Sequence, residues 1–268
     1  MAITVMEVLK RLPRTNCGDC GQPTCLAFAT RVIKEGEDLG LCPHLAAGDE
    51  FGEFLRAQQQ AGVGRRRESV AISLEVLQAK VAPLDFAALA AGLGADYGEE
   101  AGRPYLALAY FGDCLQVFKD ELRYPPGALA DPWDAILLYN YIASQGSRQP
   151  TGDWIAYNSL PNSVSKAKTL ARLERELAAH FSGQAGALKE KAARLGAEPV
   201  AVGGEDADVQ ALFQPLPRVP ILVLFWDADP AEGFQAQCRL LFDASVSDYL
   251  DLEAMLFLVE HLLVRLLA

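Results

Sequence analysis

The sequence lacks the motifs of several common enzyme classes. It has no Gly-x4-Gly-Lys-Ser/Thr phosphate-binding loop, no Gly-x-Ser-x-Gly nucleophile elbow and no His-Glu-x-x-His pair for zinc. The glycine-rich stretch at 92–98 has the wrong spacing for a dinucleotide fingerprint and follows an alanine-rich segment. No catalytic residue is therefore predicted, and the sequence leaves open whether the chain is an enzyme.

Basic residues and long apolar runs are also scarce. Lys and Arg total 24 against 35 Asp and Glu, which gives a formal net charge of −11. Nucleic acids and anionic membranes select clustered Lys and Arg, so neither partner is expected. No uncharged apolar run of about 18 residues occurs, which predicts no membrane insertion. The first residues also lack the basic and apolar regions of a signal peptide, so we expect a cytoplasmic, reducing location.

The length of 268 residues, of which 51% are hydrophobic, allows two domains with real cores. A Gly-Val-Gly stretch at 62–64, followed by three arginines at 65–67, is the best linker candidate. Residues 1–64 hold 6 Lys and Arg against 8 Asp and Glu, and the remainder holds 18 against 27. The negative charge therefore belongs mainly to the second part. We predict a small domain at 1–62 and a larger domain at 68–268, and the sequence does not indicate an oligomeric state.

The pattern of apolar residues predicts an α+β fold with a mostly antiparallel sheet, because strands bunch early and late and no regular βαβ alternation occurs. A hairpin is expected around Gly112, and Asp131 followed by Pro132 indicates a helix start. The expected helices cover 4–13, 23–36, 44–60, 68–80, 84–92, 131–142, 162–180, 183–195 and a last segment from about 251. The expected strands cover 105–111, 115–118, 199–202, 209–213, 221–226 and 239–242, with a loop or short strand from 151.

Four of the six cysteines fall within 26 residues, at the spacing Cys-x2-Cys-x4-Cys-x16-Cys, namely Cys17, Cys20, Cys25 and Cys42. Glycines beside the first two allow the backbone to turn back on itself. A helix beginning at Cys25 would favour a thiolate at its positive end. Four thiolates suit an iron–sulfur cluster of the 4Fe–4S or 2Fe–2S type. A structural zinc ion and a set of free thiols are the alternatives, although zinc sites usually show two close pairs. His44 is either a spare ligand or a surface residue.

This region resembles a known type of domain. The matching residues are Leu12-Pro13-Arg14-Thr15-Asn16-Cys17-Gly18-Asp19-Cys20-Gly21-Gln22-Pro23-Thr24-Cys25-Leu26-Ala27-Phe28-Ala29 and Cys42-Pro43. They are similar to the small 4Fe–4S domain that begins the large subunit of the corrinoid iron–sulfur protein, and to a domain in the B subunit of Rnf-type electron-transport complexes. The resemblance covers about 45–60 residues. It implies that the four clustered cysteines ligate one low-potential 4Fe–4S cluster, which in the first family helps to re-reduce cobalt and in the second passes electrons along a chain.

The rest of the chain departs from both families. It is too short for the barrel and corrinoid-binding domains of that large subunit, and it has no Asp-x-His-x-x-Gly element for a lower cobalt ligand. It also lacks the further ferredoxin-type cysteine sets of the electron-transport subunit. Neither function transfers from the cluster domain alone.

Residues 70–268 instead resemble the domain-of-unknown-function family 3786, a resemblance that implies no activity. The matching stretches are Thr151-Gly152-Asp153-Trp154, 206–226 with Leu216-Pro217-Arg218-Val219-Pro220 at its centre, Leu241-Phe242-Asp243-Ala244-Ser245 and Tyr249-Leu250-Asp251-Leu252-Glu253.

Three residues of this part are candidates for binding a second cofactor: Arg218, Asp243 and Trp154. Arg218 lies between two prolines, where it could clamp a carboxylate or phosphate. Alternatively it pairs with an aspartate and pins a loop, the candidates being Asp206, Asp208 and Asp243. Asp243 follows an expected strand and is either a functional group or a turn residue.

Other polar and aromatic residues have two interpretations each. A cluster of carboxylates could hold a hard metal ion or form a solvated turn, namely Asp227, Asp229 and Glu232. Several aromatic residues could wall a cofactor or belong to the core, namely Trp154, Trp226, Tyr139, Tyr141 and Tyr157. The remaining cysteines and histidines could form a second metal site or be buried bystanders, namely Cys114, Cys238, His180 and His261.

These observations favour an iron–sulfur protein in which a 4Fe–4S cluster exchanges electrons with a redox partner protein or a second cofactor. The resemblance to the corrinoid protein makes a corrinoid the favoured second cofactor. A binding or assembly adaptor with a purely structural metal site is one alternative. A metal-dependent enzyme that uses the carboxylates near Asp227 is the other.

Overall fold

The computed structural model describes residues 3, 5–22, 24–34, 38–45, 52, 73–128, 131–204 and 206–267. The chain divides into two compact units, Met1–Ile72 and Ser73–Ala268. The expected linker at 62–67 and most of the expected helix over 44–60 lie outside the described residues. Each unit has its own apolar cluster, so each is described by itself.

The N-terminal unit is a small helical module. Its elements are α1 (Val5–Arg11), α2 (Cys25–Lys34) and the 3-10 helix η1 (Leu39–Leu41). The two α-helices pack against each other around Val8 and Phe28, which are fully buried. Helix α2 begins where the Thr24 hydroxyl accepts the backbone N–H of Ala27 at 3.0 Å, a typical N-cap.

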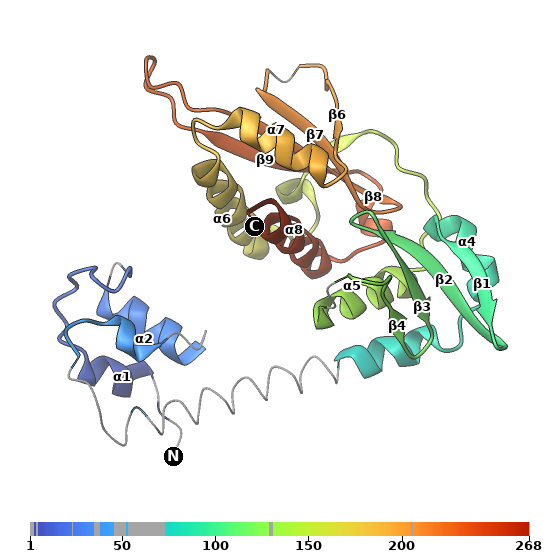
Figure 1. Cartoon of the computed structure of the whole chain (residues 1–268), viewed down its shortest axis with the longest axis horizontal. Helices are drawn as coiled ribbons and strands as arrows, with labels where there is room; N and C mark the ends of the chain where they lie inside the picture. Colours follow the sequence, from blue (N-terminus) through green and yellow to red (C-terminus); the bar gives the residue numbers. More distant parts are fainter. Residues whose placement is uncertain are drawn as a thin grey trace. The chain divides into compact units, whose positions relative to one another are not determined.

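The first sheet of the larger unit is antiparallel and has the strand order β1-β2-β3-β4 (Figure 1). The strands are β1 (Asp96–Glu100), β2 (Arg103–Tyr110), β3 (Asp113–Phe118) and β4 (Leu122–Arg123). The tight turn between β2 and β3 places Phe111 and Gly112 at φ angles of 49° and 90°. Two consecutive residues in the left-handed region match the twist of a two-residue hairpin, which explains the glycine.

A second sheet follows, with the order β5-β9-β8-β7-β6 and antiparallel pairing throughout. The strands are β5 (Trp154–Ala156), β6 (Glu198–Pro199), β7 (Val209–Leu216), β8 (Val219–Trp226) and β9 (Gln237–Asp243). Strand β8 is central and almost entirely apolar, as expected for a strand buried on both faces. Alternate residues of β8 point to two different apolar clusters, one on each face of this sheet.

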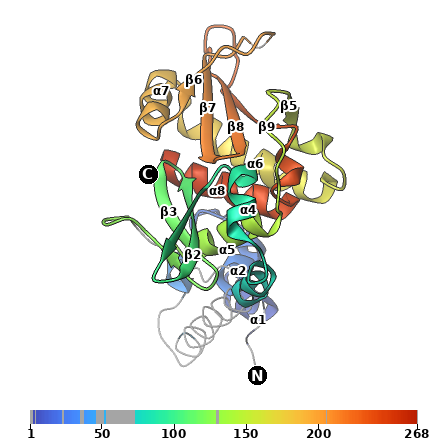
Figure 2. The same ribbon diagram turned by 90° about the vertical axis from the view of Figure 1, so that its right-hand side faces the viewer.

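Helices complete the larger unit around one main apolar cluster that includes residues of both sheets. Besides a helix over Ser73–Val81, they are α4 (Phe86–Leu93), α5 (Pro132–Ala143), α6 (Val164–His180), α7 (Ala185–Arg194) and α8 (Leu252–Leu267). Helix α8 lies between α5 and the β5–β9 sheet in both views (Figures 1 and 2). Helix α6 contacts β9, and α7 contacts β7.

No single helix in the described part of the chain has the length and apolar character that a membrane crossing requires. One bent pair, Ser73–Val81 with Phe86–Leu93, passes this test of length and composition at a bend of 107°.

The expected α+β class with antiparallel pairing is confirmed, and so are the hairpin at Gly112 and the helix start at Asp131. The expected strand at 199–202 is wrong in extent, because β6 spans two residues only. Strand β1 was not predicted, since its sequence Asp-Tyr-Gly-Glu-Glu is polar and exposed at a sheet edge.

Candidate functional site

The cysteine loop of the N-terminal unit is held by backbone conformations that few residues adopt. Gly18 and Gly21 have φ angles of 83° and 77°, and the Gly21 N–H donates to the Gly18 carbonyl at 2.8 Å. The Asn16 side chain accepts the Cys25 N–H at 2.9 Å, which ties the start of the loop to the start of α2. Glycine at these positions allows the turn between Cys17 and Cys25 without steric cost.

The structure gathers three of the four cysteines at one apolar cluster. Cys25, at the first position of α2, and Cys42, just after η1, are 7% and 6% exposed. Cys20 is half-buried and packs against the same cluster. Cys17 is exposed on the loop. The four thiols therefore range from buried to exposed within one small unit.

His44 lies at the exposed edge of this region. Its Nε2 is 2.6 Å from the Asp19 carboxylate. Hydrogen bonds from His44, and then from Cys17, lower the pKa of the Asp19 carboxyl. Among the described residues, the one set of three His, Cys, Asp or Glu residues whose ligand atoms lie within 4.8 Å of one another is Cys17, Asp19 and His44.

Arg218, a candidate cofactor ligand, binds backbone carbonyls. Its guanidinium donates to the carbonyls of Ala91 and Gly92, at 3.1 and 3.3 Å, and to the side chain of Gln149. These carbonyls lie at the C-terminal end of α4, where a cation is favourable. Arg218 therefore joins α4 to the loop after α5. This agrees with the second interpretation of Arg218, that it pins a loop, but its hydrogen-bond partners are backbone carbonyls and Gln149 and not the aspartates expected there.

Asp243 is fully buried and holds two loops in place. Its carboxylate accepts the N–H groups of Thr151, Gly152 and Ser245 at 2.7–2.9 Å and the Ser245 hydroxyl at 2.6 Å. Burial opposes ionisation, but these donors, with Ser245 foremost, keep the pKa of Asp243 below its ordinary value. The bonds position β5 beside β9, where Trp154 pairs opposite Asp243 in the register. Trp154 is half-buried and packs on the second apolar cluster of the sheet.

Two of the three carboxylates after β8 accept hydrogen bonds from backbone N–H groups. Asp227 accepts the N–H of Gly183, just before α7, and that of Ala185, the first residue of α7, the latter at 3.0 Å. Burial opposes ionisation, but the backbone N–H groups of Ala185, Ala228 and Gly183 together lower the pKa of Asp227. Asp229 accepts the N–H groups of two residues that follow it, and Glu232 is exposed. This geometry favours the solvated-turn interpretation.

The tyrosines that could have walled a cofactor belong to the core. Their hydroxyls donate to carbonyl oxygens at 2.7–2.8 Å, namely Tyr139 to Phe118, Tyr141 to Leu93 and Tyr157 to Leu252. Trp226 packs on the second cluster of the β5–β9 sheet. Cys238 is buried, which raises the pKa of its thiol, whereas Cys114 is exposed on β3.

A buried polar cluster was missed by the sequence reasoning. Asp134 of α5 is 1% exposed, and its Oδ1 lies 3.3 Å from Nδ1 of His261 on α8. The Tyr110 hydroxyl is 3.0 Å from the same nitrogen, and the Tyr124 hydroxyl donates to Asp134 Oδ2 at 3.2 Å. Burial opposes ionisation of Asp134, yet hydrogen bonds from His261 and Tyr110 lower its pKa. The predicted helix start at Asp131 put Asp134 in a first turn, but no local signal showed that it faces inward.

These features define an α+β protein in which a cysteine-loop module is joined to a domain with two antiparallel sheets. The chain belongs to the family described as "Domain of unknown function (DUF3786)", whose family model matches residues 85–265. A second family model, described as "Putative Fe-S cluster", matches residues 12–44. The N-terminal part is therefore a domain of the iron–sulfur type.

Curated relatives match a short part of the chain. The gamma subunit of the acetyl-CoA decarbonylase/synthase complex of Methanothermobacter thermautotrophicus is 48% identical over 50 residues, 19% of this chain and 11% of the relative. The corrinoid/iron-sulfur protein large subunit of Moorella thermoacetica is 46% identical over 46 residues, which are 17% of this chain and 10% of the relative. The chain thus spans about a tenth of the length of these relatives. No solved structure matches it.

Proposed function

We propose that this protein carries one 4Fe–4S cluster on Cys17, Cys20, Cys25 and Cys42 and exchanges electrons with a partner protein or with a second cofactor held by the larger unit. The observation that carries the proposal is the four-cysteine loop, which is matched by an iron–sulfur family model over 12–44. The named relatives, a corrinoid/iron-sulfur protein and a complex subunit, support a redox role and a protein partner.

The surroundings of the four cysteines fit a 4Fe–4S cluster. Cys25 lies at the N-terminus of a ten-residue helix, where the partial positive charge stabilises a thiolate. Cys20 and Cys42 contribute thiols at the edge of the same apolar cluster, which shields one side of the site from water. Cys17 and the exposed loop around it leave the other side open to a partner. When bound, an iron–sulfur cluster of this kind supplies one-electron transfer.

The spacing of the cysteines bears on the choice of metal. Zinc sites with four cysteine ligands usually show two close pairs, whereas this chain has a triplet, Cys17, Cys20 and Cys25, and a distant single, Cys42. Four thiolates at this spacing suit an iron–sulfur cluster. The adaptor hypothesis with structural zinc is therefore the second candidate, and the enzyme hypothesis is weakened by the turn role of Asp227 and Asp229.

Metal analysis of cysteine variants tests the ligand set. After anaerobic purification, we expect a brown protein with about four iron and four sulfide per chain. Cys25→Ser should lose most of both, because it removes a buried ligand. Cys114→Ser is the matched control and should keep both, since Cys114 is exposed on a strand of the other unit. A colourless protein with one zinc would contradict the proposal. So would an equal loss of iron and sulfide in Cys25→Ser and Cys114→Ser.

The second cofactor is identified separately. By similarity to the corrinoid/iron-sulfur protein large subunit, a corrinoid is the favoured occupant of the larger unit. The proposed location is the cytoplasm, because a reducing compartment keeps the cysteine thiols free to bind iron. Mass spectrometry of an acid–methanol extract of the purified protein should show a corrinoid mass. An extract without one would remove the corrinoid from the proposal and leave the partner protein.

A further inference from the structure

Two short backbone turns carry polar side chains at the cysteine site. The first turn spans residues 18–21, is closed by a backbone hydrogen bond of 2.8 Å and contains Asp19. The second spans residues 42–45, is closed by one of 3.2 Å and contains His44. Each turn also contains one of the four clustered cysteines. A hydrogen-bonded turn fixes the backbone direction at its central residues, so it also fixes where their side chains begin.

The side chains of Asp19 and His44 meet, although 25 positions separate them in the sequence. Nε2 of His44 lies 2.6 Å from Oδ2 of Asp19. The contact joins the loop that carries Cys17 and Cys20 to the segment that carries Cys42. Groups next to metal ligands commonly orient those ligands before the metal binds. A contact at this place therefore limits the positions that the distant Cys42 can take.

The Asp19 carboxylate also lies beside a proposed ligand of the cluster. One of its oxygens is within 4.8 Å of the Cys17 sulfur. The Asp19 side chain is about half exposed, and an exposed aspartate is ionised at neutral pH. A negative charge close to a cluster opposes the addition of an electron, because the electron is repelled by it. Asp19 is therefore placed to disfavour reduction.

We propose that Asp19 and His44 form a clasp that acts on the cysteine site in two ways. Their contact holds Cys42 beside the other three ligands. The Asp19 carboxylate lowers the potential at which the cluster takes one electron from its redox partner. Both are positioning residues, because they act through the ligands and are not ligands themselves. This inference rests on the proposed 4Fe–4S function and concerns the regulation of that same site.

Retention of iron tests the contact. Full-length variants are purified anaerobically, and the rate of iron loss to an excess of a ferrous chelator is measured. His44→Ala should lose iron about threefold faster than the wild type, because a contact of the strength of an exposed ion pair is removed. His44→Gln should lose iron at nearly the wild-type rate, since its amide N–H can still donate to Asp19. His180→Ala, exposed at the end of α6, is the matched control.

The midpoint potential separates the effect of the charge from that of the contact. Asp19→Asn removes the charge and keeps a carbonyl oxygen that accepts a hydrogen bond. It should favour reduction about threefold, an upward shift of about 30 mV at about 59 mV per tenfold change. His44→Ala keeps the Asp19 carboxylate, so it should not raise the potential. A role in folding alone would not separate the two variants in this way.

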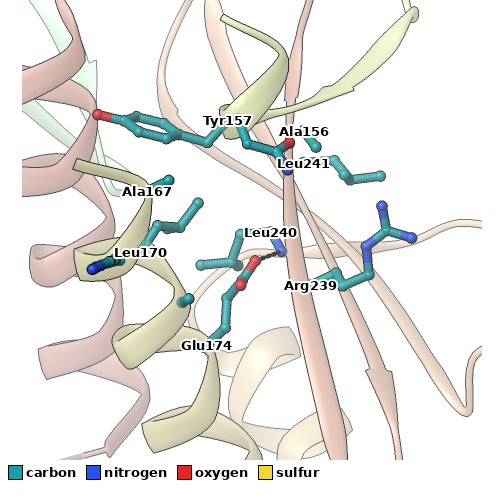
Figure 3. Close-up of a pocket in the computed structure, with 11 residues that line it drawn as sticks. Ala156, Tyr157, Ala167, Leu170, Glu174, Arg239, Leu240 and Leu241 are labelled. Atoms are coloured by element: carbon teal, nitrogen blue, oxygen red, sulfur yellow. Dashed lines mark hydrogen bonds between the residues drawn. The ribbon is translucent and has the colours of Figure 1, made fainter. Parts of the chain in front are cut away.

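A carboxylate of the larger unit provides the control for the loss of a charge. Glu174 of α6 accepts the N–H of Leu240 on β9 through its Oε1 at 2.9 Å, as Figure 3 shows. Glu174→Gln removes this carboxylate and keeps an oxygen that can accept the same N–H. Because Glu174 is not part of the cysteine site, its replacement should leave the midpoint potential unchanged.

The outcomes distinguish a failure of the clasp from a failure of the proposed function. Two results would overturn the clasp and leave the cluster in place. One is iron loss from His44→Ala at the wild-type rate. The other is a potential of Asp19→Asn that equals that of the wild type or shifts no more than that of Glu174→Gln. A wild-type protein that holds no iron and no sulfide would overturn the proposed function, and the clasp with it.

Discussion

At the scale of single residues, Asp243 shows how a buried charge can hold a fold together. Five donors from two loops converge on its carboxylate, the Thr151 hydroxyl among them, so the ionised form is favoured even without exposure to water. An amide in its place would turn one N–H2 group toward backbone N–H donors. We expect Asp243→Asn to lower the free energy of unfolding of the larger unit by about 2–3 kcal/mol at pH 7.

The same residue predicts a pH dependence. Because the pKa of Asp243 is lowered in the folded state, its stabilisation is complete above about pH 5 and is lost as the pH falls through the folded-state pKa. Urea unfolding of the wild type and Asp243→Asn at pH 7 and pH 3 should therefore show a difference that shrinks in acid. Asp153→Asn changes an exposed neighbour and is the control. It should leave the free energy of unfolding unchanged at both pH values. A difference that persists at pH 3 would show that the charge of Asp243 is not the cause.

At the scale of elements, the cluster of Asp134 and His261 joins α5 to α8, with Tyr110 adding the end of β2. Removing one member leaves the other buried without its partner. We expect His261→Ala to cost about 3 kcal/mol, because the Asp134 charge then lacks its imidazole. The double variant Asp134→Asn/His261→Ala should cost less than the sum of the single changes by at least about 1 kcal/mol.

Urea unfolding of the three variants measures this coupling. His180→Ala is the matched control, since His180 is exposed at the end of α6, and its loss should have no measurable effect. If the losses of unfolding free energy in the two single variants simply add up in the double variant, Asp134 and His261 stabilise the unit independently, and the predicted coupling is wrong.

The elements that sequence reasoning found are those with strong local signals. Strand β8 is an unbroken apolar run, the β2–β3 hairpin has glycine at its turn, and α5 begins with an aspartate cap followed by proline. Strand β1 is polar and depends on its pairing with β2, so it carries no such signal. The division of the strands into two sheets was also beyond local reasoning, because it depends on which strands pair over long distances.

The features of the candidate site also divide into those that the sequence could predict and those that it could not. The cysteine pattern is local, since three of the four cysteines fall within nine residues, and it could be recognised directly. The partners of Arg218 are backbone carbonyls of α4, which no side-chain pattern indicates. Asp134 and His261 come from distant parts of the chain, and so do Glu174 and Leu240. Such pairs become visible only when the helices pack on the sheet.

At the scale of the whole molecule, the chain combines two compact units that differ in composition and structure. The N-terminal unit has a loop of thiols beside a small core, and the larger unit has a fully formed apolar cluster of its own. The boundary predicted at 62–68 lies outside the described residues and stays a prediction. In the proposed function, the first unit holds the redox centre and the second holds the partner or cofactor.

The central claim is that the four cysteines hold one redox-active 4Fe–4S cluster. The most direct test is an electron paramagnetic resonance spectrum of the anaerobically purified full-length chain, recorded before and after reduction with dithionite. The account predicts a protein without a signal as isolated and, after one-electron reduction, a spin-half signal of about one spin per chain. A chain that contains one zinc and no sulfide, and that gives no signal after reduction, would contradict it.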